Sequence, residues 1–355
     1  VAINPQTGDI LTMVGSRDYF DEEIEGNFNV TLAKRQPGSS IKPYVYASAF
    51  QKGYRPETIV FDLPTQFSTA CEPWDMSNES PCYAPKNYNG KYVGPLSLRN
   101  ALAQSLNIPA VKVLYLTGLK DAIKLAGDMG ITTLNDPDRL GLTLVLGGGE
   151  VTLLEHTGGY AVFANEGVKA KRRAILKIED INGNVIEETP EESTRVMERD
   201  TALLISDVLS DNVARTPLWG NYSMVNFGDR DVAVKSGSTN NSRDAWIMGY
   251  APNLAVGVWV GNNDNTPMNG LSGLIATPMW RQFLDFALKD LEVQSFPPPP
   301  PLDPNLKPIL RGEIMDPALL LEQVQSGSSS VSAASVAGGI HNILHFVDRD
   351  SPLGP

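Results

Sequence analysis

The sequence predicts an α+β fold, in which an antiparallel sheet of about five strands is flanked by helices. Residues 1–14 contain two apolar runs around an Asn-Pro-Gln-Thr-Gly-Asp turn, a pattern typical of a β-hairpin. Residues 231–260 contain three strand-like runs joined by short turns, which indicates an antiparallel meander. These runs supply about five strands, and the helical pattern at residues 278–291 would cover one face of their sheet.

Helical patterns dominate the chain between the hairpin and the meander. An apolar run that ends at Gly53 predicts a buried helix, and Ser97 is placed to cap a helix from residue 98 to about residue 106. Pro109 suits the first turn of a helix that extends to about residue 116. Further helices are expected at residues 119–129, 152–165 and 200–209.

Two stretches depart from this helical pattern. Residues 54–96 are rich in Pro, Asn, Ser and Tyr and have little periodicity, so we expect a long, partly irregular excursion that walls the site. Residues 174–188 alternate around an Asn-Gly-Asn turn, which predicts a β-hairpin within a small inserted subdomain at residues 167–192.

The main domain is expected to cover residues 1–292. Five consecutive prolines follow Phe296 and indicate a stiff, extended spacer, and a later stretch is rich in Gly, Ser and Ala. Residues 293–340 are therefore predicted to be a linker.

Composition limits the possible partners. The chain has 355 residues, with 29 basic and 41 acidic side chains and a formal charge of −12, and it has no long block of basic residues. A nucleic-acid partner is therefore not expected. The sequence has no signal peptide and no run of 18 apolar residues, but it opens inside a strand-like run, so we expect a fragment, and its location stays open.

Two cysteines, Cys71 and Cys82, leave two interpretations open. They lack the paired spacing of a zinc site and are too few for a disulfide framework. They could form one bridge in an oxidising compartment, or they could be two unpaired thiols.

The stretch that carries the chemistry is residues 35–43, which contains the pattern Ser39-x-x-Lys42. Residues three apart on a helix share a face, so Ser39 and Lys42 point together, whereas Ser40 and Lys42 do not. A hydroxyl beside an amine that accepts its proton is an activated nucleophile, and the field of a helix N-terminus favours the attacking oxyanion. The alternative is a helix cap followed by a solvated lysine.

Two further motifs follow in the order that this chemistry uses: Ser105-x-Asn107, at the junction between two predicted helices, and Lys235-Ser236-Gly237, at the end of a predicted strand. Each alone has a structural explanation, as a helix cap or an ordinary strand end. The three motifs together, in order and on compatible elements, favour acyl transfer through a serine.

Other sites are not supported. Residues 147–149 are three glycines without the spacing of a phosphate loop, and there is no G-x-S-x-G motif. His156 lies on an apolar helical stretch, where a core role is expected, and His341 and His345 lie in the tail without an H-E-x-x-H motif. No metal site and no cofactor are expected.

The chain resembles the transpeptidase domain of class A, bifunctional penicillin-binding proteins, within the superfamily that includes the serine β-lactamases. The resemblance covers about residues 1–290 and rests on the three motifs and on the stretches RQPGS (35–39), AQSLNIPA (103–110), GGGEVT (147–152) and VWVGNN (258–263). It implies that residues 341–355 begin a C-terminal segment that is cut short here.

The resemblance and the residue chemistry together predict four catalytic residues. Ser39 would be the nucleophile and Lys42 its general base, which requires lowering the lysine pKa from near 10.4 by burial and by a second positive charge. Lys235 would supply that charge, and Ser105 would relay the proton to the leaving amine.

Substrate binding is assigned to the remaining motif residues. Asn107 would hold a substrate amide, and Lys235 with the hydroxyls of Ser236 and Ser238 would bind a C-terminal carboxylate. Gly237 would allow close approach to the substrate, and Thr239 completes the substrate-binding set. The resemblance places the oxyanion hole at the backbone N–H groups of Ser39 and Ser238. The family's commoner motif has threonine at both serine positions, which puts substrate preference in doubt.

The function implied is a peptidoglycan D,D-transpeptidase, which cross-links stem peptides through a Ser39 acyl-enzyme and is blocked covalently by β-lactams. Alternatives on the same fold are a D,D-carboxypeptidase, a serine β-lactamase, or a non-catalytic β-lactam sensor or wall-binding scaffold. The chain lacks a Glu-x-x-Leu-Asn element of the kind that class A β-lactamases use. The resemblance also implies an upstream glycosyltransferase domain and membrane anchor, and a place on the extracytoplasmic face of the bacterial cytoplasmic membrane.

Overall fold

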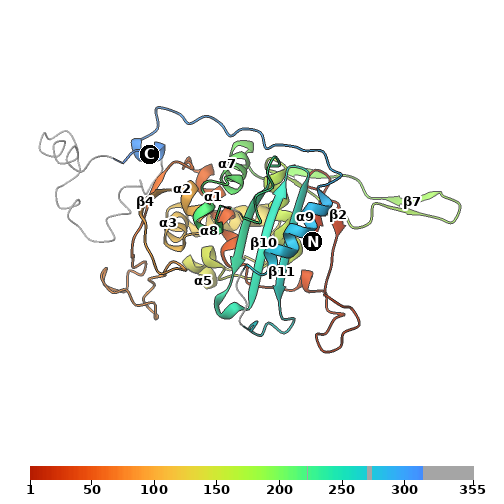
Figure 1. Ribbon diagram of the computed structural model, residues 1–355, viewed down its shortest axis with the longest axis horizontal. Helices are drawn as coiled ribbons and strands as arrows, with labels where there is room; N and C mark the ends of the chain where they lie inside the picture. The colour runs from red at the N-terminus through yellow and green to blue at the C-terminus, as the bar shows by residue number, and fades with distance from the viewer. Residues whose placement is uncertain (222, 270–273, 315–355) are drawn as a thin grey trace, which may run out of the picture.

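A computed structural model describes residues 1–221, 223–269 and 274–314. Its centre is a five-stranded antiparallel sheet in the order β2-β1-β11-β10-β9 (Figure 1), which confirms the predicted α+β fold class. The strands are β1 (Ala2–Ile3), β2 (Ile10–Thr12), β9 (Ala233–Ser238), β10 (Asp244–Ala251) and β11 (Leu254–Gly261). The opening hairpin joins the late meander through Ala2, which pairs with Val256.

The two faces of this sheet carry separate apolar clusters. Alternation along β10 directs Ala245 and Ile247 to one face, where they pack with Trp280 of helix α9 (Ala276–Ala287). Trp246 and its alternate neighbours join the larger cluster on the opposite face. Figure 1 shows α9 lying across the sheet. The predicted covering helix is therefore confirmed, although it begins two residues early and ends at residue 287.

The larger cluster is built with helices α1 (Lys42–Gln51), α6 (Leu153–Ala164) and α7 (Arg199–Ser210). The remaining helices of the described chain are α2 (Leu98–Ala103), α3 (Asn107–Thr117), α4 (Leu119–Asp128), α5 (Pro137–Leu140) and α8 (Thr216–Trp219), with 3-10 turns η1 (Val30–Leu32), η2 (Gly38–Ile41), η3 (Gly141–Leu146), η4 (Asn240–Ser242) and η5 (Pro308–Arg311). Among them, none is both long enough and apolar enough to cross a bilayer.

Helix ends follow their capping residues. The Ser97 side chain accepts a hydrogen bond from Asn100 N and starts α2, as predicted. This helix ends at Ala103, three residues before the predicted end, because Ser105 takes a φ of +60° that no α-helix allows. The next helix starts at Asn107 rather than at Pro109.

The inserted region contains the predicted hairpin. Strands β6 (Lys177–Glu179) and β7 (Val185–Glu188) pair antiparallel, and Figure 1 shows them projecting from the domain. A second pair, which the sequence did not predict, joins β5 (Val168–Ala170) to β8 (Ser193–Arg195) at the base. The paired insertion therefore extends to Arg195, beyond the expected limit at residue 192.

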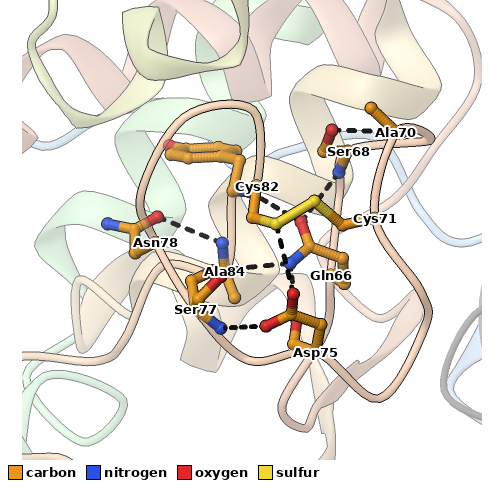
Figure 2. Close-up of a disulfide and its surroundings, with 10 residues drawn as sticks. Gln66, Ser68, Ala70, Cys71, Asp75, Ser77, Asn78, Cys82 and Ala84 are labelled. Atoms are coloured by element: carbon orange, nitrogen blue, oxygen red, sulfur yellow. Dashed lines mark hydrogen bonds between the residues drawn. A yellow bond between two sulfur atoms is a disulfide. The ribbon is translucent and has the colours of Figure 1, made fainter.

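The excursion at residues 54–96 is tied together by one short sheet and one disulfide. Strand β3 (Ile59–Asp62) pairs with β4 (Gly94–Ser97), so the two ends of the excursion lie side by side. Cys71 and Cys82 form a disulfide (Figure 2). The buried Gln66 side chain lies beside it, donates to Asp75 O at 2.6 Å and accepts from Tyr83 N at 2.7 Å.

The structure differs from the prediction after residue 292. The described part of the predicted linker, residues 293–314, returns to the domain instead of leaving it (Figure 1). Phe296 contacts the ring of Tyr250 at 5.5 Å, and Leu310 is 1 % exposed within the larger cluster. Apolar side chains after the five prolines explain the difference, because their burial attaches the segment to the domain. Residues 315–355 lie outside the described residues.

This packing gives a prediction for stability. Leu310→Ala removes a buried side chain and should lower the free energy of unfolding by about 2–5 kcal/mol, measured by chemical denaturation. Leu302→Ala is the matched control, because Leu302 is 36 % exposed, and should cost about 1 kcal/mol or less. Equal stability of the two variants would contradict the attachment of this segment.

Candidate active site

The turn that carries Ser39 is held between two other segments. Ser39 lies in the 3-10 turn η2, which leads into α1, rather than in the first turn of the α-helix itself. Gly38 has a φ of +53°, and a Cβ there would lie 2.7 Å from Ser238 N. A Cβ on Gly147 would lie 2.4 Å from Gly38 N. Both glycines are needed because the backbones approach closely.

Lys42 is fully buried at the start of α1. Its ammonium donates to Ser105 O at 2.7 Å, to Leu106 O at 3.1 Å and to Asn107 Oδ1 at 2.8 Å. Burial, and then the positive charge of Lys235, hold the lysine pKa well below its usual 10.5. Lys42 therefore connects the first motif to the second and is destabilised as a cation.

Ser105 lies between two lysines. Its carbonyl accepts from Lys42, and its hydroxyl accepts from Lys235 Nζ at 2.7 Å. Burial lowers the pKa of Lys235 to about 7. A hydroxyl that accepts from an ammonium still has its own hydrogen to donate. The φ of +60° at Ser105 is uncommon for serine and directs both polar groups of one residue to the two lysines.

Asn107 is supported by a buried polar chain from the excursion at residues 54–96. Its backbone N–H donates to Asn87 Oδ1 at 2.8 Å, and its side-chain amide donates to Lys86 O at 2.9 Å. Asn87 in turn donates to both carboxylate oxygens of Asp62, at 2.8 and 2.9 Å. Asp62 is completely buried. Sequence reasoning missed Asp62 and Asn87, since neither belongs to a recognisable motif.

The third motif lies on β9, the edge strand of the sheet. A Cβ on Gly237 would lie 2.1 Å from Pro37 O, so only glycine allows this strand to pack against the turn before Ser39. Ser236 is half-buried, and Ser238 is exposed at the strand end. Thr239 exchanges hydrogen bonds with the buried Asp244 and closes the turn between β9 and β10, which gives it a structural contact that the sequence did not predict.

The structure thus brings the predicted residues together to different degrees. Lys42, Ser105, Asn107 and Lys235 meet through direct hydrogen bonds. Ser39 joins them through its turn, which is packed against the backbone of Ser238. The arrangement offers a hydroxyl on a constrained turn, two amines of lowered pKa and a second hydroxyl between them. These groups suit nucleophilic attack with proton transfer.

His156 is confirmed as a core residue at 0 % exposure, in an aromatic environment below the Ser39 turn. His341 and His345, the other histidines considered, lie outside the described residues. Cys71 and Cys82 lie close to Asp75, but their sulfurs are bonded to each other and are not available as thiolate ligands.

Fold and site define a class of protein: a five-stranded antiparallel sheet packed against helices, with an S-x-x-K serine, an S-x-N turn and a Lys-Ser-Gly edge strand brought together. The family described as "Penicillin binding protein transpeptidase domain" matches residues 1–285. The chain belongs to this family.

Individual relatives agree with this assignment. Penicillin-binding protein 2D of Bacillus subtilis (strain 168) is 34 % identical over 305 residues, which are 84 % of this chain and 42 % of that protein. Penicillin-binding protein 1A of Neisseria flavescens is 32 % identical over 306 residues, 84 % of this chain and 37 % of that protein. The chain therefore spans about two fifths of the length of these curated relatives.

Solved structures show the same fold. Penicillin-binding protein 1A from Haemophilus influenzae superposes with a TM-score of 0.74 at 27 % identity, over 89 % of this chain and 51 % of that one. PonA1 from Mycobacterium tuberculosis superposes with a TM-score of 0.71 at 22 % identity, over 85 % of this chain and 80 % of that one.

The low pKa of Lys235 predicts a pH dependence of stability. Unfolded, this lysine keeps its proton up to about pH 10.5, whereas folded it loses the proton above about 7. Between these values the unfolded state binds more protons, so the free energy of unfolding rises with pH, by at most about 1.4 kcal/mol per pH unit for one proton. The stability of the parent relative to Lys235→Met should therefore increase from pH 7 to pH 9 in chemical denaturation.

The variant serves as the control for titrating groups other than Lys42, whose pKa Lys235 itself lowers, since its methionine carries no proton. A difference between the two proteins that stays flat over this range would contradict a buried lysine of lowered pKa.

Proposed function

We propose that this chain is the D,D-transpeptidase domain of a peptidoglycan-building enzyme. The observation that carries the proposal is the pair of buried lysines, Lys42 and Lys235, that converge on Ser105 beside the Ser39 turn. Family membership and the names of the curated relatives support the same class of reaction.

The first half-reaction forms an acyl-enzyme. Neutral Lys42 takes the proton of the Ser39 hydroxyl as its oxygen attacks the carbonyl carbon of the penultimate D-alanine in a D-Ala-D-Ala stem peptide. The new bond joins Ser39 Oγ to that carbon, and the carbon–nitrogen bond to the last D-alanine breaks. Ser105 passes a proton from the lysines to the leaving amine, so D-alanine departs neutral at nitrogen and the acyl group remains as an ester.

The second half-reaction reverses these roles. An amine on a neighbouring stem peptide attacks the ester carbon and loses a proton through Ser105 to Lys42, and the ester bond to Ser39 breaks. The serine oxygen recovers its proton, and an amide now joins the two peptides. Attack by water instead would give a D,D-carboxypeptidase.

Lys42 begins each cycle in contact with three acceptors. An ammonium has three N–H groups for them, whereas a neutral amine has two and a lone pair. Lys42 must therefore release one of these hydrogen bonds before it can act as the base. Asn107 Oδ1 is the acceptor to release, because the Asn107 side chain can rotate toward a substrate amide. Burial and Lys235 favour that release, because both lower the pKa of Lys42.

Binding of the substrate uses the edge strand. Lys235 and the hydroxyls of Ser236 and Ser238 would bind the C-terminal carboxylate. The backbone N–H groups of Ser39 and Ser238 would form the oxyanion hole, which the close approach of Gly38 to Ser238 supports. Thr239 would act on substrate indirectly, because its hydroxyl is bonded to Asp244.

The wider setting is proposed on the same basis. An upstream glycosyltransferase domain and a membrane anchor would place the domain on the extracytoplasmic face of a bacterial membrane, and the Cys71–Cys82 disulfide fits an oxidising compartment. The transpeptidase domain would span residues 1–292, followed by a linker at residues 293–340 and a further C-terminal segment from residue 341. The partners would be stem peptides and, as inhibitors, β-lactams.

Penicillin labelling tests the nucleophile. Intact-protein mass spectrometry after incubation with a penicillin should show one stable adduct on the parent and none on Ser39→Ala, because the adduct is an ester of that hydroxyl. Ser48→Ala, in helix α1 that follows the Ser39 turn, is the control and should be labelled like the parent. Labelling of Ser39→Ala, or intact drug with no adduct on the folded parent, would overturn the proposal. Hydrolysed drug with no adduct would identify a β-lactamase instead.

A second prediction concerns recognition of the carboxylate. We compare turnover of a D-Ala-D-Ala peptide with that of its C-terminal carboxamide, in the parent and in Ser238→Ala. The parent should prefer the carboxylate, and the variant should lose about tenfold of this preference, as expected for a charge-assisted hydrogen bond of about 1.5 kcal/mol. The ratio cancels effects on chemistry that both peptides share, so an unchanged ratio would remove Ser238 from the carboxylate site.

A further inference from the structure

Ser40, the neighbour of the proposed nucleophile, contacts the core through its side chain. It is completely buried, whereas Ser39 is half-buried. Its hydroxyl donates to Pro37 O at 2.7 Å and lies 2.8 Å from His156 Nε2. A serine hydroxyl has one hydrogen, which Pro37 O receives, so the hydrogen shared with His156 must come from the imidazole. His156 therefore carries its proton on Nε2 and donates to Ser40.

The other imidazole nitrogen has a matching partner. His156 Nδ1 is then an acceptor, and the Tyr44 hydroxyl lies 3.1 Å from it and 3.3 Å from His156 O, so its one hydrogen is shared between these two acceptors. The hydrogen bonds run in one direction, from Tyr44 through His156 and Ser40 to the carbonyl of Pro37. All four groups are buried or at the turn, and each donor has an acceptor.

A neutral imidazole fits this chain, since its unprotonated Nδ1 is an acceptor that faces the Tyr44 hydroxyl. Burial lowers the pKa of His156 to about 3, so the ring stays neutral at physiological pH. The ring is also held sterically: it stacks on Tyr44 at 5.6 Å, and its edge contacts involve Tyr160 at 5.2 Å and Trp246 at 5.6 Å between centroids.

The same aromatic group holds other atoms of the turn. Trp246 Nε1 donates to Gln36 O at 2.8 Å, and the Tyr160 hydroxyl donates to Ser40 O at 2.7 Å. The Ser40 hydroxyl also donates to Pro37 O. Core side chains therefore hold backbone carbonyls on both sides of Ser39 by hydrogen bonds. The motif Ser39-x-x-Lys42 leaves residue 40 unspecified, and in this chain that residue connects the turn to the core.

We propose that His156 is a positioning residue, which fixes the turn carrying Ser39 by donating a hydrogen bond from Nε2 to the Ser40 hydroxyl. The proposal rests on the proposed function, because Ser39 is taken as the nucleophile. His156 touches no reacting atom; it acts through Ser40, so its removal changes how well Ser39 is aimed. A misplacement on the order of 1 Å can cost about 100-fold in rate.

The test uses three replacements of His156 in the full chain. Gln places an amide N–H near the position of Nε2, Asn reaches only as far as Nδ1, and Leu has no polar atom. We measure the second-order rate constant for acylation by a fluorescent penicillin, corrected for the folded fraction. His156→Leu and His156→Asn should lose about tenfold or more, and His156→Gln should stay within about threefold of the parent.

A double-mutant cycle separates positioning from stability. Ser40→Ala should lower acylation about as far as His156→Leu, and adding His156→Leu to Ser40→Ala should change the rate less than about twofold, because both remove one connection. Tyr250→Phe is the matched control: it deletes another buried hydrogen bond, to Ser206 at 3.0 Å, and should lower stability without changing acylation.

Hydrogen exchange provides a readout that does not depend on activity. Amides of residues 38–41 should exchange faster in His156→Leu than in the parent, and at the parent's rate in His156→Gln and Tyr250→Phe. If the parent forms no penicillin adduct, the proposed function fails. The hydrogen-exchange comparison still tests whether His156 positions the Ser39 turn. Full acylation by folded His156→Leu, additive effects in the cycle, or unchanged exchange would each overturn the inference.

Discussion

The side-chain amines of two buried lysines both donate hydrogen bonds to Ser105, and the rest of the site depends on this arrangement. Lys42 and Lys235 each reach Ser105, one at its carbonyl and the other at its hydroxyl, and neither lysine is exposed to water. Burial lowers the pKa of both lysines, and the positive charge of Lys235 lowers the pKa of Lys42 further. Helix α1 holds Lys42 and edge strand β9 holds Lys235, so the stability of the remaining fold compensates for a site that is electrostatically destabilised.

Three backbone approaches make that arrangement possible. Gly38, Gly147 and Gly237 lie where segments distant in the sequence meet, and a Cβ on any of them would overlap neighbouring backbone. They bring the Ser39 turn against the end of β9 and against the loop before α6. The turn is then supported from the core through Ser40 and from the sheet through Trp246. Close packing and directional hydrogen bonds thus act on the same few residues.

The fold and much of the site could be predicted from sequence because their signals are local. Apolar runs joined by short turns indicated the hairpin and the meander, Ser97 indicated a helix start, and the spacing of Ser39 and Lys42 indicated a shared direction. Boundaries were less accurate where one residue changes the path, as Ser105 does with its positive φ. The return of residues 293–314 to the domain was not predicted, since burial of Leu310 depends on where the chain goes after its prolines.

The sequence by itself determined the fold class, the family resemblance and the residues of the three motifs, because these depend on local periodicity and on residue type at fixed spacing. Tertiary structure alone decided which groups touch. Asp62 and Asn87, from the excursion at residues 54–96, hold Asn107 through hydrogen bonds. The hydroxyl of Thr239 donates to Asp244. His156 and Ser40, which are 116 residues apart in the sequence, share a hydrogen bond. Hydrogen bonds act over about 3 Å, so partners far apart in the chain become visible only when the fold has brought them together.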